Sequence, residues 1–211
     1  MTTVVAFVSQ KGGVGKSTLA RGLARESSQS GLQVKLADLD PMQKTVADWH
    51  AARLQSGFEP IGDVQIFATI NQALTNIDIY DLIIIDGAAR ATTGTLEIAR
   101  KSNLVVQPSG ASIDDLKPAV REFNGLVKAG IPKDRLVFAL NHIATDAEEK
   151  DARDYLIDSG YNVLDGFLME RAAYRIAQNI GLSITETKFK SLNSRADSLI
   201  QSLIDMVANN G

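Results

Sequence analysis

The sequence predicts an α/β fold in which helices cover both faces of a doubly wound, mainly parallel sheet. Short and nearly continuous apolar runs alternate with longer amphipathic segments. Strands that are apolar throughout are typical of a parallel sheet buried on both faces, and strand–helix alternation implies right-handed crossovers. The expected strands are Val4–Val8, Val34–Ala37, Val64–Ala68, Leu82–Ile85, Leu104–Val106 and Leu136–Leu140, with a weaker one that includes Val163 and Leu164.

Helices are expected between and after these strands. The first follows a glycine-rich segment, where apolar residues recur at helical spacing from Leu19 to Ala24. Thr145 with Glu148 forms a capping-box pattern that predicts the start of another helix. The last helix is expected from about Ser194 to Ala208, with its apolar residues on one stripe.

The whole chain, residues 1–211, is expected to form a single domain, because no linker, repeat or low-complexity tract interrupts it. It contains no cysteine, which excludes disulfides, iron–sulfur clusters and cysteine-based zinc sites. The net charge of −3 means that any DNA binding needs a local basic patch or an assembly. No apolar stretch reaches the roughly 18 residues of a membrane helix and no signal peptide is recognisable, so we expect a cytoplasmic protein without a membrane partner.

The clearest motif is QKGGVGKST, Gln10–Thr18, which follows a predicted strand and precedes a predicted helix. Its glycines allow a tight turn close to an anion, and the following helix adds the positive end of its dipole. This pattern is a P-loop, which binds nucleotide phosphates, and we expect ATP with Mg²⁺. Lys16 is assigned to the β- and γ-phosphates, Ser17 to Mg²⁺ and Thr18 to the α-phosphate. The remaining loop residues predicted to bind nucleotide are Gly12, Gly13, Val14 and Gly15.

Acidic residues follow two of the predicted strands. Asp38 and Asp40 come after Val34–Ala37, and Asp86 comes after the aliphatic run Leu82–Ile85. Ligands of an open parallel sheet lie beyond the carboxyl ends of its strands, so these carboxylates are expected near the P-loop. Asp86 occupies the Walker B position and is expected to hold Mg²⁺ through water. Asp38 is assigned to the metal shell or to support of the loop, and a helix N-cap or turn is the alternative for one of the first two.

The P-loop departs from the standard form GxxxxGK[ST], because Gln10 replaces the first glycine and Lys11 adds a second lysine. It resembles the deviant Walker A box, KGGxGK[ST], of partition ATPases, cell-division site regulators, nitrogenase iron proteins and arsenite-pump ATPases. The resemblance implies that Lys11 reaches the partner's nucleotide across a dimer, with a solvated loop lysine as the alternative. It also implies that Asp40 positions the hydrolytic water and that Asn141 contacts adenine, although Asn141 is nearly as well explained as a turn cap.

A second switch region is expected to start at Gly87 and to continue through Ala88, Ala89 and Arg90. The family commonly has a proline shortly after this glycine, and here there is none. The first switch also differs, because Met42 separates the Asp-Pro pair from Gln43 where the family often reads DPQ.

Within the family, the chain resembles the small ParA-type partition ATPases that lack an N-terminal helix-turn-helix domain. The missing cysteines argue against nitrogenase iron proteins and arsenite-pump ATPases, and residues 196–211 lack the basic residues of a lipid-binding helix. The resemblance implies that ATP closes a homodimer, that this dimer binds DNA without sequence preference, and that a ParB-like centromere-binding protein stimulates hydrolysis at the nucleoid. Candidate DNA contacts are Arg171, Arg175, Lys188, Lys190 and Arg195, with ordinary surface charge as the alternative for each.

Two other functions stay open. One is a MinD-like or scaffold-type ATPase that positions a protein complex. The other is an ATP-dependent small-molecule synthetase of the same superfamily, although the sequence contains no recognisable substrate motif. The two histidines, His50 and His142, match no metal-ligand spacing.

Overall fold

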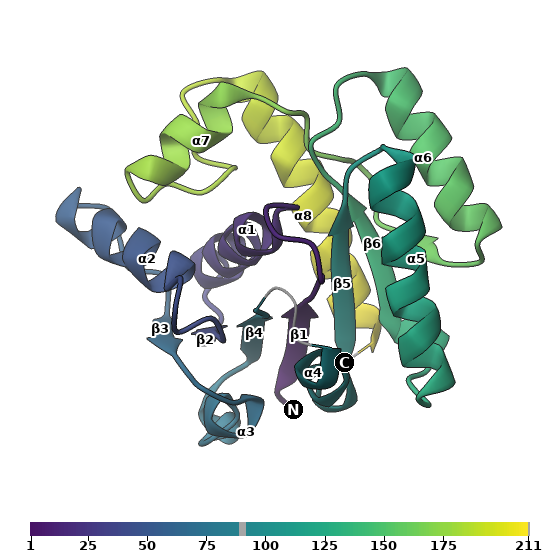
Figure 1. Ribbon diagram of the computed structural model, residues 1–211. Helices are drawn as coiled ribbons and strands as arrows, with labels where there is room; N and C mark the ends of the chain where they lie inside the picture. Colours follow the sequence, from purple (N-terminus) through teal and green to yellow (C-terminus); the bar gives the residue numbers. More distant parts are fainter. Residues whose placement is uncertain (89–91, 211) are drawn as a thin grey trace.

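The computed structural model describes residues 1–88 and 92–210, in which the strands form one seven-stranded sheet (Figure 1). All neighbouring strands pair in parallel, in the order β3-β2-β4-β1-β5-β6-β7. The predicted doubly wound parallel fold is confirmed, and each predicted strand is present within a few residues. The strands are β1 (Thr3–Phe7), β2 (Val34–Asp38), β3 (Asp63–Ile66), β4 (Leu82–Asp86), β5 (Leu104–Ser109), β6 (Leu136–Leu140) and β7 (Asn162–Val163).

Helices connect these strands, and none within the described residues is long and apolar enough to cross a bilayer. The Thr145 hydroxyl oxygen accepts a hydrogen bond from the Glu148 N–H, as the capping-box pattern predicts. The helices are α1 (Lys16–Gln29), α2 (Thr45–Gln55), α3 (Ile70–Ala73), η1 (Ile77–Ile79), α4 (Thr92–Lys101), α5 (Ile113–Lys128), η2 (Lys133–Arg135), α6 (Asp146–Asp158), α7 (Ala172–Asn179) and α8 (Lys190–Asn210).

Helix α8 begins at Lys190, earlier than the predicted Ser194. Leu192 in the first turn packs against the same core as Leu199 and Leu203, so the apolar stripe extends further toward the N-terminus than predicted. The first turn is also stabilised by Asn193, whose side chain accepts from the Thr187 N–H and donates to the Thr187 carbonyl.

The strand side chains alternate between two apolar cores, one on each face of the sheet. In β1, Val4 and Ala6 face one core, while Val5 and Phe7 face the other. Residues of α3, α4, α5 and α6 complete the first core, and residues of α1, α2, α7 and α8 complete the second (Figure 1). Burial on both faces explains why these strands are nearly continuous in apolar residues.

The register of the central strands brings three segments to one edge of the sheet. Phe7 of β1 lies beside Asp86 of β4, and Asp86 lies beside Asp38 of β2. Because the strands are parallel, the segments that follow them leave at the same edge. The glycine-rich loop after β1 therefore meets the acidic ends of β4 and β2, which are distant from it in sequence.

Candidate functional site

The loop between β1 and α1 depends on glycine for its backbone conformation. Gly13 and Gly15 have φ angles of 75° and 107°, which residues with a side chain rarely adopt. A Cβ on Gly15 would also lie 1.8 Å from Asn141 Nδ2. By contrast, a Cβ on Gly12 or Gly13 would meet no heavy atom within 4 Å. The space beside these two exposed glycines is therefore open.

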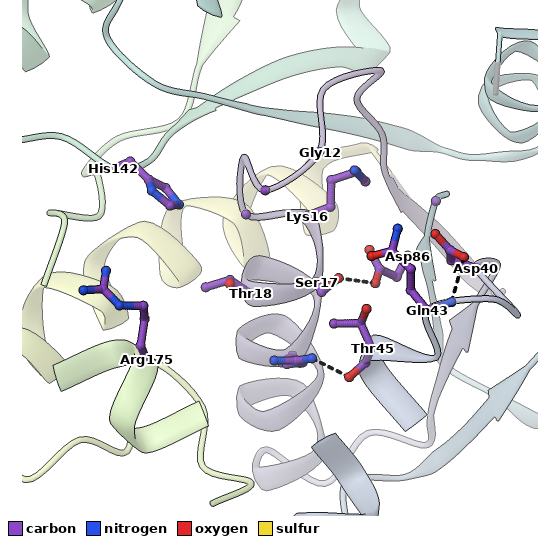
Figure 2. A pocket seen from close by; sticks show the side chains of 14 residues that line it. Gly12, Lys16, Ser17, Thr18, Asp40, Gln43, Thr45, Asp86, His142 and Arg175 are labelled. Carbon is purple, nitrogen blue, oxygen red and sulfur yellow. Dashed lines mark hydrogen bonds between the residues drawn. The ribbon is translucent and has the colours of Figure 1, made fainter. Parts of the chain in front are cut away.

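A cavity of about 330 Å³ lies in front of this loop. Its walls come from the loop and α1, from the segment after β2, from the end of β4, and from His142 and Arg175. Figure 2 shows these last two on the opposite side of the cavity from Asp40 and Asp86, with Thr18 between them. Helix α1 has no acidic residue in its first turn, so the positive end of its dipole is uncompensated there. The cavity is therefore suited to an anion.

Lys16 is a buried, positively charged residue of this cavity. It is the first residue of α1, and its Nζ donates to the Lys11 carbonyl at 3.5 Å. Burial lowers the pKa of Lys16, and the negative charge of Asp86 opposes this shift. Within the described residues Lys16 forms no ion pair closer than 4 Å. A phosphate in the cavity would supply the missing partner.

Ser17 and Asp86 have the donor chemistry of a magnesium site. Asp86 Oδ2 accepts a hydrogen bond of 2.6 Å from Ser17 Oγ, while Asp86 Oδ1 is buried and has no hydrogen-bond partner in the described part of the chain. Burial raises the pKa of Asp86 to about 7, although the bond from Ser17 acts in the opposite direction. Among the described residues, no group of three or more acidic or histidine side chains gathers into a metal site. The pair therefore fits Mg²⁺ if substrate oxygens and waters complete the coordination.

The two carboxylates after β2 have different surroundings. Asp38 is 0% exposed, and its oxygens accept from the backbone N–H groups of Asp40 at 2.9 Å and Val46 at 3.0 Å. Asp38 thus supports the segment that leads into α2, and its contribution to a metal shell stays a prediction. Asp40 is half-buried, lines the cavity and accepts from the Gln43 N–H at 3.1 Å. Of the two, Asp40 is the carboxylate that lines the cavity.

Asn141 braces the loop through its side-chain amide. Its Nδ2 donates to the Val14 carbonyl at 2.8 Å, and its Oδ1 accepts from the His142 N–H at 2.9 Å. The predicted contact with adenine stays a prediction, because both ends of the amide are engaged within the chain. A smaller cavity of about 80 Å³ lies beside Asn141 and Thr18, and Met169, Tyr174 and Arg175 also line it.

Lys11 is not among the residues that line the large cavity of its own chain. Its side chain is 54% exposed and forms an ion pair with Asp115 of α5, which also accepts a hydrogen bond from the Ser112 hydroxyl. The two lysines of the loop therefore differ, because Lys16 faces the cavity and Lys11 lies along α5.

The candidate DNA contacts lie on α7, on the start of α8 and on the segments preceding them. Arg175 also lines the large cavity and lies 3.6 Å from Glu170 Oε1, so a phosphate in the cavity is a second possible ligand for it. Arg195 stacks 4.5 Å from the ring centroid of Phe167, and Lys188 lies 5.2 Å from that of Phe189. Arg171 and Lys190 are exposed. Their contacts with DNA stay a prediction.

The expected second switch is only partly within the described residues. Gly87 follows β4 and lines the cavity, and a Cβ on it would lie 2.8 Å from the Phe7 carbonyl. Ala88 is described, whereas Ala89 and Arg90 lie outside the described residues.

Several residues of the site escaped the sequence analysis. Glu122 of α5 accepts from the Gln10 N–H at 3.1 Å and fixes the start of the loop. His142 and Thr45 line the cavity without belonging to any motif. Arg21 of α1 is buried and also lines the cavity, and nothing in the sequence pattern indicates it.

Comparison with known proteins identifies the family. The family model described as the CobQ/CobB/MinD/ParA nucleotide binding domain matches residues 5–184. The chain belongs to this family. The match confirms the resemblance that the deviant loop indicates, and it makes nucleotide binding the shared property of the domain.

The relatives of this ParA/MinD-family chain include proteins named for partition and a protein named for septum-site determination. Protein ParA of Rhizobium radiobacter is 26% identical over 202 residues, which cover 92% of this chain and 90% of that protein. The septum site-determining protein MinD from Pyrococcus horikoshii, complexed with Mg-ADP, has a TM-score of 0.74 at 18% identity and covers 100% of this chain and 99% of its own. A Borrelia burgdorferi protein assigned to plasmid partition, bound to AMPPNP, has a TM-score of 0.71 at 17% identity, with 97% and 98% covered. The two structures share the fold of this chain.

Proposed function

We propose that this ParA/MinD-family domain hydrolyses ATP with Mg²⁺ and uses the nucleotide to control its own assembly. Lys16, the Ser17–Asp86 pair and Asp40 line one cavity at the edge of the sheet, and this meeting is the observation that supports the proposal. The α1 N-terminus and Lys16 would bind the β- and γ-phosphates. Relatives solved with Mg-ADP and with AMPPNP agree with this choice of ligands.

Each polar group of the cavity then has a separate task. Mg²⁺ would neutralise charge that develops on the phosphate oxygens, and Ser17 and Asp86 would hold it. Lys16 would donate to the same oxygens and stay protonated in their field. Asp40 would accept a hydrogen bond from the attacking water, because its carboxylate faces the cavity while that of Asp38 is occupied by backbone N–H groups. The smaller cavity beside Asn141 would receive the base.

We propose further that two ATP-bound subunits close face to face and exchange Lys11. In one chain this lysine is exposed and does not line its own cavity, which supports a role in the partner's site. Closure would require Lys11 to leave Asp115. An added cation would stabilise the charge of the transition state, as an arginine finger does in other nucleotide hydrolases.

Partition of DNA is the cellular function we favour for this dimer. The fold alone suits positioning of a protein complex equally well, because MinD shares it. The ParA relative, which aligns with nearly the whole chain, is the reason for preferring partition. In the partition cycle a ParB-like protein would stimulate hydrolysis and release the dimer from nonspecific DNA in the cytoplasm. A synthetase would instead show ATP turnover only with a carboxylate or amide substrate.

Salt-dependent retention of duplex DNA tests the partition proposal. With a nonhydrolysable ATP analogue, the protein should bind random duplex DNA, and binding should weaken as salt rises because released counterions drive it. Replacing Arg171, Lys188, Lys190 and Arg195 with alanine should lower the slope of log K against log salt by roughly 0.9 for each DNA phosphate that the variant no longer neutralises. Arg175 is left unchanged because it lines the nucleotide cavity.

The matched control removes four exposed basic residues from other helices, and it should bind DNA like the unchanged protein. These residues are Arg100, Lys101, Lys128 and Lys150. Failure of the unchanged protein to bind DNA in the presence of the analogue would reject the partition proposal. Equal binding by the two quadruple variants would reject the assigned surface.

A further inference from the structure

A buried arginine joins three elements at the base of the large cavity. Arg21 of α1 is 7% exposed and lines the cavity one helical turn after Ser17. Its Nη2 donates to the Thr45 carbonyl of α2 at 2.5 Å, and its Nη1 donates to Gln178 Oε1 of α7 at 2.9 Å. The guanidinium carbon lies 5.2 Å from the ring centroid of Trp49. One side chain thus connects α1, α2 and α7.

Burial of Arg21 is unfavourable in free energy, because both groups that accept its hydrogen bonds are neutral. Burial lowers its pKa to about 10, against the opposing charges of Asp86 and Asp38, so it stays protonated at neutral pH. Its Nε is buried without a hydrogen-bond partner in the described part of the chain. A buried cation without an ion pair destabilises a fold relative to an apolar side chain. Packing alone therefore does not explain an arginine at this position.

The Thr45 carbonyl marks the end of the segment that carries Asp40. Asp38 holds this segment through the N–H groups of Asp40 and Val46. Between them, Lys44 has a φ angle of 51°, a left-handed conformation that is unfavourable for lysine. Strained backbone persists only where its surroundings fix it. The bond from Arg21 ties this turn to α1 and hence to the nucleotide loop.

Gln178 links this arrangement to the nucleotide through Thr18. Its Oε1 accepts from Arg21 Nη1 and also from Thr18 Oγ1 at 3.2 Å. Thr18 is the residue assigned to the α-phosphate, so its hydroxyl would turn from Gln178 to the nucleotide. Gln178 Oε1 would then accept a hydrogen bond from Arg21 alone. A better oriented Arg21 would in turn strengthen its hydrogen bond to the Thr45 carbonyl.

We propose that Arg21 is a positioning residue for hydrolysis, which fixes the Asp40–Thr45 segment against the nucleotide cavity and is itself oriented by Gln178. It acts through the backbone of this segment and touches no reacting atom. The inference rests on the proposed ATPase function, because Asp40 is the group whose position matters.

Arg21→Lys keeps the charge but removes the planar donor that reaches both acceptors. The kcat for ATP should fall by about 10- to 100-fold, because displacing a catalytic group by about 1 Å has an effect of this size. The KM for ATP should change by less than about threefold, since the phosphate contacts are retained. Arg25→Lys is the matched control on the next turn of α1, where the arginine pairs with Glu26 and Glu186 instead.

Trypsin cleavage after the exposed Lys44 reports how firmly the Asp40–Thr45 segment is held, and it does so independently of ATP hydrolysis. With ADP and Mg²⁺ bound, Arg21→Lys should be cut there several-fold faster than the unchanged protein, whereas Arg25→Lys should be cut at the unchanged rate. If the unchanged protein hydrolyses no ATP, the proposed function fails while the cleavage rates still test the positioning. Unchanged kcat and unchanged cleavage in Arg21→Lys would overturn the inference.

If Arg21→Lys folds poorly, variants of Gln178 provide a second test. Gln178→Leu removes the acceptor and should reproduce both effects of Arg21→Lys in weaker form. Gln178→Glu keeps an acceptor oxygen for Arg21 and should restore the kcat and the slow cleavage. If Gln178→Leu matched the unchanged protein in both measurements, Gln178 would not orient Arg21 and the inference would be wrong.

Discussion

Replacing Asp40 with alanine is expected to lower the kcat of ATP hydrolysis by roughly 10²–10⁴-fold, the range of a lost general base. Binding of ATP should persist, because the glycine loop, Lys16 and the Ser17–Asp86 pair are untouched. Asp38 is not expected to replace Asp40, since both of its oxygens already accept backbone N–H groups. Steady-state phosphate release gives the kcat, and titration with a fluorescent ATP analogue gives the affinity.

The same variant should accumulate as an ATP-bound dimer, because the step that opens the dimer is blocked. Light scattering should therefore give twice the subunit mass with ATP and the single mass with ADP. Asp48→Ala is the control, because Asp48 is an exposed carboxylate of α2 close to the same segment. Rapid hydrolysis by Asp40→Ala would show that another group positions the water.

Replacing Lys11 with alanine is expected to lower kcat by about 10³-fold, as loss of an arginine finger does. The affinity of the single subunit for ADP should change little, because Lys11 does not line its own cavity. Dimerisation with a nonhydrolysable ATP analogue should weaken, and light scattering against protein concentration measures it. Lys117→Ala removes an exposed lysine of α5 near Asp115 and should change neither property. Loss of ADP binding by the Lys11→Ala monomer would contradict a role in the partner's site.

The sequence predicted the parts of this molecule that depend on short-range patterns. The P-loop occupies consecutive residues, and its glycines have a local conformational cause, as the positive φ angles of Gly13 and Gly15 demonstrate. The strands were predictable because each one is buried on both faces and reads as an apolar run. Asp40 and Asp86 were predictable because they follow such runs.

The remaining contacts depend on how distant segments meet. The strand order cannot be read from apolar runs, yet it places β4 between β1 and β2 and so brings Asp86 beside the loop. The ion pair of Lys11 with Asp115 joins the loop to a helix that starts much later in the chain. The bond of Arg21 with Gln178 likewise depends on α7 lying beside α1. An arginine in a helix ordinarily indicates an exposed face, so its burial here ran against the pattern.

Mixing two inactive variants tests the shared active site most directly. In a dimer of Lys11→Ala with Asp40→Ala, the nucleotide of the Lys11→Ala subunit would have its own Asp40 and its partner's Lys11. An equal mixture should therefore restore at most about a quarter of the unchanged rate, because random pairing would make half of the dimers mixed and each mixed dimer holds one complete site of two. Trapped Asp40→Ala homodimers and the weaker dimerisation of Lys11→Ala lower this share. Hydrolysis that rises on mixing is the result we predict. If the mixture hydrolysed ATP no faster than the two variants measured separately, Lys11 would not act across a dimer, and the account of a two-subunit ATPase site would be wrong.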